Sequence, residues 1–291
     1  MDETLQLLHT PLGIPGSGRV RYGAAMELFR QGVLSEAQLD LYREASPFDA
    51  RDPATLLQER GLPPVLPLPG SAASVLRRLL AAAGDYLADL THPGHEDVRR
   101  GLARCGPEAG HSPAKQHPVV ERWLETALRH AAEHAPHLAD AIAAAAPHLA
   151  WISYDRYPRH EIGESFAEGH AFAAIAGGDA PFPAADFELG LFLIAPHVLY
   201  RDHCHRAPEL YAPLTGPHGW RFAPERPLIV KPAGEPVWNP SLQPHLTKVG
   251  AVPFLCLFVW TRDVAEAARV MPAGDWAEIE AAELAAAQRA S

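Results

Sequence analysis

The chain has 291 residues, a formal net charge of −10, 47% hydrophobic residues and 21% charged residues. This balance is typical of a globular protein with a packed core and excludes a disordered or fibrous chain. The acidic charge, without any run of lysine or arginine, argues against a nucleic acid partner, and the apolar stretch 251–260 is far shorter than the roughly 20 residues that a membrane-spanning helix needs.

The amino terminus has acidic residues where a secretory signal would have basic ones, and no long apolar segment follows it. We therefore expect a cytoplasmic protein. Cys105, Cys204 and Cys256 are an odd set with no close pairing, which favours free thiols in a reducing compartment over a disulfide framework.

Helix patterns dominate up to about residue 150. Ser35 and Gln38 have the spacing of a capping box, in which each side chain satisfies a free backbone amide, so a short helix is predicted to begin there. Apolar residues at steps of three and four predict a second helix over 71–90. A third pattern runs over 119–145 and is interrupted by Pro136.

Beyond residue 150, short runs of aromatic and branched residues alternate with turn residues, which is typical of β-strands. The predicted strands are 187–194, 220–222, 228–231 and 254–260. Strands at this close spacing favour a sandwich or small barrel. We therefore predict a helical amino-terminal region over 1–150, a β-barrel domain over 151–265 and a helical carboxy-terminal tail over 266–291.

The segment 200–216 carries the polar residues of greatest interest. Residues two apart on a strand face the same side, so His203 and His205 are predicted to project together, and Glu209 follows after a short turn. Two imidazoles and a carboxylate suit zinc, iron, manganese or nickel, with His245 as the candidate fourth ligand. Because an isolated His-x-His pair is more often incidental, the metal prediction depends on the added carboxylate and the third imidazole.

This segment resembles the first motif of the cupin superfamily, which consists of His-x-His, three residues, Glu, six residues and Gly. The matching residues are His203, His205, Glu209 and Gly216. His197 replaces the glycine that usually opens the motif, and only Pro240 and His245 remain of the second motif. The resemblance implies a mainly β cupin fold, a double-stranded β-helix, with a helical amino-terminal region and a short carboxy-terminal helix.

Within the cupins, the chain is similar to the dimethylsulfoniopropionate (DMSP) lyases, in which one tyrosine precedes the two histidines and another follows the glutamate. The residues that reproduce this arrangement are Tyr200, His203, His205, Glu209 and Tyr211, with His245 and Trp260 downstream. The resemblance spans about residues 150–262. It implies a divalent metal ion bound by His203, His205, Glu209 and His245, and a small-molecule substrate that is a sulfonium carboxylate.

The resemblance also implies a carbon-sulfur lyase that cleaves DMSP to dimethyl sulfide and acrylate by β-elimination. Tyr211 is the candidate base, since a nearby metal ion lowers the pKa of a phenol from about 10. Tyr200 would orient the carboxylate or carry a second proton. The resemblance implies that Tyr200, His203 and Trp260 bind the substrate. Trp260 offers an aromatic face to the sulfonium cation.

Several alternatives stay open. Tyr211 can instead be a core tyrosine bonded to a backbone carbonyl. The same ligand set serves dioxygenases, decarboxylases and isomerases, and a relative of the lyases can act on another substrate. A non-catalytic binding cupin would hold a ligand without turnover. The amino-terminal third is open to three interpretations, namely a cap on the barrel mouth, a homodimer surface or an extension of the core.

Overall fold

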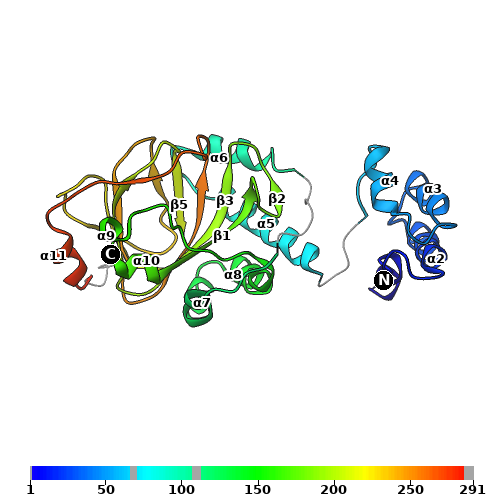
Figure 1. Ribbon diagram of the computed structural model, residues 1–291, viewed down its shortest axis with the longest axis horizontal. Helices are drawn as coiled ribbons and strands as arrows, with labels where there is room; N and C mark the ends of the chain where they lie inside the picture. Colours follow the sequence, from blue (N-terminus) through cyan, green and yellow to red (C-terminus); the bar gives the residue numbers. More distant parts are fainter. Residues whose placement is uncertain (1, 66–70, 107–112, 285–291) are drawn as a thin grey trace. The chain divides into compact units, whose positions relative to one another are not determined.

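The structure is a computed structural model that describes residues 2–65, 71–106 and 113–284. The chain divides into two compact units, residues 1–75 and residues 76–291. The helices of the first unit are α1 Asp2–Leu8, α2 Ser17–Arg30, α3 Glu36–Ala45 and α4 Pro53–Glu59 (Figure 1). They pack around a core of their own, to which Leu28 and Leu57 contribute fully buried side chains.

Helix α3 begins at the predicted capping box. The Ser35 hydroxyl accepts a hydrogen bond from the backbone amide of Gln38, and the Gln38 side chain accepts one from the backbone amide of Ser35. Two amides that the first turn leaves free are thereby satisfied, and the prediction is confirmed.

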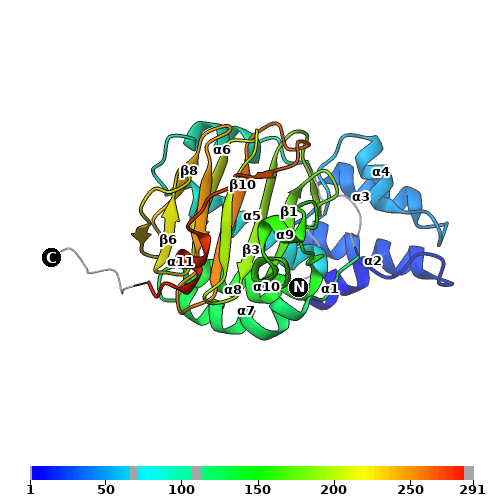
Figure 2. The ribbon, with the colours of Figure 1, turned by 60° about the vertical axis from the view of Figure 1, so that its left-hand side comes forward.

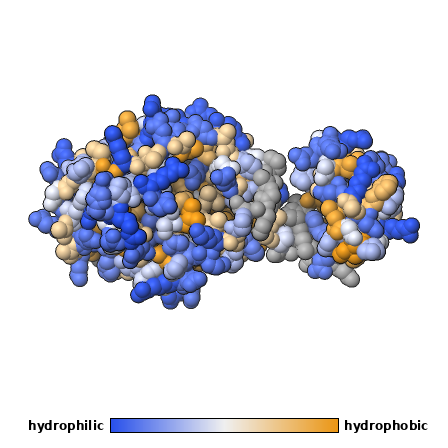
Figure 3. Space-filling view, in the orientation of Figure 1, coloured by the Kyte–Doolittle hydropathy of each residue, from blue (hydrophilic) through white to orange (hydrophobic). Residues whose placement is uncertain are grey.

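The first unit carries several large apolar side chains on its surface. They are Leu7, Leu12, Ile14, Val20, Phe29 and Phe48. The second unit is mainly hydrophilic on the face drawn in Figure 3, with scattered apolar side chains. Exposed apolar side chains are ordinary on protein surfaces, so they indicate no partner by themselves.

Helices open and close the second part of the chain. They are α5 Ala72–Ala88, α6 His95–Leu102, α7 Pro118–Ala131, α8 Pro136–Ala145, the 3-10 helix η1 Ala146–His148, α9 Arg159–Ile162, α10 Glu164–Gly169 and α11 Trp276–Ala281. The helices predicted over 71–90 and 119–145 are confirmed. Pro136 lies in the first turn of α8, where the helix does not need the amide hydrogen that proline lacks.

The strands of this unit form two sheets. Their bounds are β1 His170–Gly177, β2 Phe182–Pro183, β3 Glu188–Ile194, β4 Leu199–Cys204, β5 Glu209–Pro213, β6 His218–Arg221, β7 Ile229–Lys231, β8 Val237–Asn239, β9 His245–Lys248, β10 Phe254–Trp260 and β11 Arg269–Val270. The larger sheet has the order β2-β1-β3-β10-β5-β8 and the smaller sheet the order β11-β4-β9-β6-β7. Each predicted strand overlaps an observed one.

The strand order is that of a double-stranded β-helix. Strands β3, β4, β5 and β6 alternate between the two sheets, and β8, β9 and β10 alternate again on the way back. Apart from the parallel pair β1 and β2, the paired strands are antiparallel. This order is typical of a jelly roll, so the predicted mainly β cupin fold is confirmed.

Alternation along the strands produces two cores. On β3, Leu189, Leu191 and Leu193 face outward and pack with residues of α5, α7 and α8, which lie against the larger sheet (Figure 2). Phe192 faces inward, where both sheets contribute aromatic side chains to a second core. The inward core leads directly to the polar residues of the barrel.

The structural division at residue 75 differs in place from the change of composition near residue 150. Helices α5, α7 and α8 share a core with the larger sheet, which places them in the same compact unit as the barrel. The division into 1–150, 151–265 and 266–291 stays a prediction.

Between residues 266 and 284 the chain contains both a short strand and a short helix. Arg269–Val270 pairs with β4 as strand β11, and helix α11 contacts β4. The described part of the chain contains no helix long and apolar enough to cross a bilayer. Cys105, Cys204 and Cys256 are free, as expected.

Candidate active site

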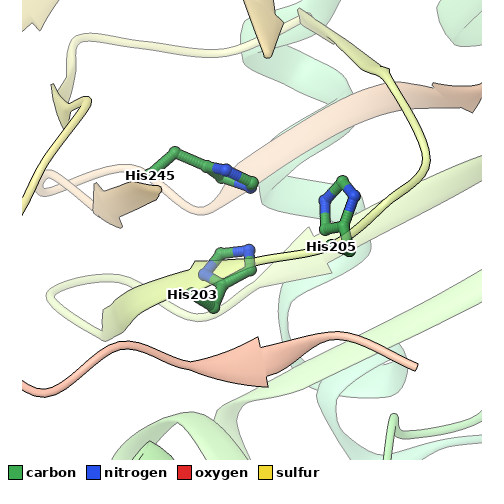
Figure 4. Close-up of side chains that lie close together, drawn as sticks. All are labelled: His203, His205 and His245. Carbon is green, nitrogen blue, oxygen red and sulfur yellow. The ribbon is translucent and has the colours of Figure 1, made fainter. Parts of the chain in front are cut away.

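Three histidines from two antiparallel strands meet inside the barrel. His203 on β4 lies directly opposite His245 on β9, and His205 follows one residue after the end of β4. Figure 4 shows the three rings close together, with His203 and His245 on neighbouring strands. Each ring is buried, and one nitrogen from each lies within 4.8 Å of the other two.

The backbone orients each imidazole. The Nδ1 atoms of His203, His205 and His245 lie 2.8, 2.7 and 2.9 Å from the carbonyl oxygens of Arg201, Ala207 and Gln243. A carbonyl oxygen only accepts, so each Nδ1 carries the proton and donates it. In the neutral form of such a ring, the Nε2 atom keeps its lone pair.

The carboxylate of Glu209 joins this cluster. Its Oε2 lies 3.1 Å from Nε2 of His205 and 3.3 Å from Nε2 of His245, and its Oε1 accepts a hydrogen bond of 2.7 Å from the indole of Trp260. Nε2 of His203 has no hydrogen-bond partner among the described residues. Lone pairs that face one another in a buried space repel, so a cation between them would satisfy the whole set.

The protonation states of His203 and Glu209 also suit a metal ion. Burial and the imidazoles of His245 and His205 hold the pKa of His203 well below its ordinary value. Burial alone would raise the pKa of Glu209, but its contacts with His205 and His245 outweigh this effect and hold the pKa below the ordinary value. Neutral imidazoles and an ionised carboxylate are the forms that bind divalent zinc, iron, manganese or nickel.

Aromatic rings stack behind His203. The ring centroid of Tyr200 lies 3.9 Å from that of His203, Phe166 lies 4.0 Å from Tyr200, and His170 lies 4.1 Å from Phe166. The hydroxyl of Tyr200 lies 2.9 Å from that of Tyr157. Burial raises the pKa of both phenols well above the ordinary value, so they form a neutral hydrogen-bonded pair.

A cavity of about 790 Å³ opens beside the cluster. Its polar and aromatic lining includes Tyr157, Tyr200, His205, Glu209, Tyr211 and Trp260. Tyr211 lies two residues after Glu209 on β5 and shares its face, and burial together with the Glu209 carboxylate raises the pKa of this phenol. The volume is in the range of small-molecule sites, roughly 300–1,000 Å³.

The structure thus brings every predicted site residue into one region. His203, His205 and His245 cluster beside Glu209, while Tyr200, Tyr211 and Trp260 line the adjoining cavity. Their roles as ligands, base and substrate-binding groups stay predictions. Sequence reasoning missed Tyr157 and Phe166, because neither lies on a strand whose alternation would have assigned it to the interior.

His197, which stands where the cupin motif usually has a glycine, adopts a backbone conformation that glycine favours. Its φ is 65°, in the left-handed region where glycine is least strained. Its carbonyl oxygen accepts a hydrogen bond of 2.8 Å from Nζ of Lys248. The turn before β4 therefore keeps a glycine-like conformation with a histidine in place.

Comparisons with known proteins identify a family for the chain. The model of the dimethylsulfoniopropionate lyase family matches residues 95–256, which is more than half of the chain. The curated DMSP lyase DddQ of Ruegeria pomeroyi is 27% identical over 108 residues, a match that spans 37% of this chain and 53% of that relative. The matched part is therefore about half of the length of the curated relative.

Solved structures show the same fold. A chain from the crystal structures of the DMSP lyases RdDddP and RnDddQII is 25% identical, with a TM-score of 0.58 over 69% of this chain and 100% of that chain. The DMSP lyase DddQ from Ruegeria pomeroyi DSS-3 is 21% identical, with a TM-score of 0.52 over 68% of this chain and 96% of that chain. With the family model matched over most of the barrel, the chain belongs to the dimethylsulfoniopropionate lyase family.

Proposed function

We propose that this chain is a metal-dependent lyase that converts DMSP to dimethyl sulfide and acrylate. One observation carries the proposal: the Nε2 atoms of His203, His205 and His245 converge beside an ionised carboxylate, next to a cavity whose lining includes the phenols of Tyr200 and Tyr211. Family membership and the DMSP lyases among the structural relatives support the substrate. We assign the three imidazoles and Glu209 as the metal ligands.

The chemistry requires removal of a weakly acidic proton from the carbon beside the substrate carboxylate. When bound, a divalent ion would supply positive charge that stabilises both the carboxylate and a phenolate beside it. Tyr211 is the proposed base, and its phenolate oxygen takes the proton. The electrons of the broken C–H bond form the new double bond, the C–S bond breaks, and the sulfur leaves with its electron pair.

The remaining residues hold the substrate. Tyr200, which is hydrogen-bonded to Tyr157, is proposed to orient the carboxylate and to carry a second proton. Trp260 is fixed by its hydrogen bond to Glu209 and is proposed to place its ring against the sulfonium group. The cavity thereby brings the proton and the base together in one orientation, which is a large part of the catalytic effect expected of such a site.

The test is headspace analysis of dimethyl sulfide released by the purified, metal-loaded protein. We expect release from the unaltered protein, a fall of about a hundredfold or more in Tyr211→Phe, and loss on treatment with a chelator. Tyr154→Phe is the matched control, because Tyr154 lines the same cavity but its hydroxyl accepts a hydrogen bond from the backbone of Ala268. This variant should keep its activity.

The same preparation separates the other functions. Release of dimethyl sulfide no greater than that of Tyr211→Phe would refute the proposal. Oxygen uptake would then indicate a dioxygenase. Tight binding of DMSP without any product would indicate a binding protein.

A further inference from the structure

A second carboxylate, that of Glu188 on β3, faces the cavity from the inner face of the larger sheet. In the strand register Glu209 on β5 lies opposite Trp260 on β10, and Trp260 lies opposite Glu188 on β3. Opposed residues of neighbouring strands place their side chains on the same face. Glu188 is therefore in one row with the proposed metal ligand, roughly 10 Å away across two strand spacings, and it lines the cavity.

The surroundings of Glu188 leave its charge poorly compensated. Burial and the charge of Glu209 disfavour its ionised form, and the attraction of Arg156, which also lines the cavity, offsets them only in part, so its pKa rises to about 7. No hydrogen bond to a described residue contributes to this balance. A half-buried carboxylate in this state gains stability from a cation that enters the cavity.

Aromatic side chains surround the same end of the cavity. Trp260 is the neighbour of Glu188 in the row, and Phe258, two residues earlier on β10, lies opposite Gly190. A Cβ atom on Gly190 would lie only 2.5 Å from the Phe258 ring, so the glycine leaves room for this ring over β3. The rings of Phe258 and Phe172 lie edge to face at 6.2 Å, and both line the cavity.

We infer that Glu188 supplies the negative charge of the cation subsite beside Trp260 and Phe258, and that this charge makes the cavity prefer an onium group over a neutral group of the same shape. Aromatic faces and one carboxylate are the groups that recognise a weakly hydrated cation. Trp260 lies between Glu188 and Glu209 in the row. An onium group against the Trp260 ring would therefore be within reach of Glu188, while the substrate carboxylate would lie at the histidine cluster. This inference rests on the proposed function for the end of the cavity that takes the carboxylate.

Two unreactive ligands of equal shape test the subsite. 3-(Trimethylammonio)propanoate carries a cationic nitrogen where 4,4-dimethylpentanoate carries a neutral carbon. Titration calorimetry of the metal-loaded protein should show tighter binding of the cation. In Glu188→Gln the ratio of the two dissociation constants should fall about tenfold, while the affinity for the neutral ligand stays unchanged.

Glu266→Gln is the matched control, because Glu266 also lines the cavity but is exposed and already paired with Arg206. Its ratio should equal that of the unaltered protein. A Glu188→Gln variant that loses affinity for both ligands equally, or keeps the ratio, would overturn the subsite, as would an unaltered protein that does not prefer the cation.

Dimethyl sulfide release, measured on the same samples, separates this inference from the proposed function. A preference for the cation that depends on Glu188, without any release of dimethyl sulfide, would support the subsite and refute the proposed lyase activity. Release of dimethyl sulfide, with a ratio of the two dissociation constants that Glu188→Gln does not change, would support the lyase activity and refute the subsite.

Discussion

The tautomers of the three site histidines are decided by single backbone contacts. The carbonyl oxygens of Arg201, Ala207 and Gln243 each accept a proton from Nδ1 of one ring. Such contacts fix the ring orientation of metal-binding histidines and leave Nε2 for the ion. The three rings are thus oriented to donate electron pairs to a metal ion, and this orientation does not depend on a bound substrate.

His245→Ala tests this preparation at one residue. The variant loses one converging lone pair, so its affinity for Zn²⁺ should fall by about a hundredfold or more in competition with a chelating dye. His130→Ala is the control, since His130 lies half-exposed on α7 beside Glu133, away from the cluster. Equal metal content in His245→Ala and the unaltered protein would show that the cluster does not hold the ion.

At the scale of elements, strand β4 carries the site on one face and an ion-pair network on the other. His203 points into the barrel, while its neighbour Asp202 bonds to the guanidinium of Arg221 on β6. Arg221 also pairs with Asp275, and the indole of Trp276 donates to Asp202 at 2.8 Å. The network ties β4, β6 and the start of α11 together.

Breaking this network is expected to destabilise the barrel. Arg221→Met leaves the fully buried carboxylate of Asp202 without its cationic partner, so the free energy of unfolding should fall by about 3–5 kcal/mol in denaturant titrations. Arg206→Met, which removes an exposed pair with Glu266, is the control and should keep its stability. Equal stability of the two variants would mean that β4 is held by its backbone pairing alone.

At the scale of the whole molecule, buried neutral histidines make stability depend on pH. His218 is fully enclosed, its Nδ1 accepts a hydrogen bond from the amide of Gly250, and its Nε2 lies 3.2 Å from Oγ1 of Thr215. Burial lowers its pKa from 6.5 to about 3, although the Thr215 contact opposes this. The unfolded chain therefore binds more protons than the folded protein between these two values.

The free energy of unfolding should consequently fall as the pH drops from 6.5 toward 3, with a contribution of about 1.4 kcal/mol per pH unit from this one group within the window. His218→Gln removes the titrating ring, so the stability gap between variant and unaltered protein should narrow as the pH falls. Denaturant midpoints measured at several pH values check this, and parallel curves would contradict it.

Much of the site was open to sequence reasoning because it depends on local spacing. Alternation along a strand placed His203 on the inner face, the short turn before Glu209 brought it beside His205, and the capping box at Ser35 began α3 where expected. These features depend on residues that are neighbours in the chain, and local geometry dictates them.

Tertiary structure alone decided the rest. The register between β4 and β9 placed His245 opposite His203, and the register across β5, β10 and β3 aligned Glu209, Trp260 and Glu188 in one row. Tyr157 and Phe166 reach the site from segments without a strand period. Pairings between distant segments follow from how whole sheets pack, and no pattern within a single segment records them.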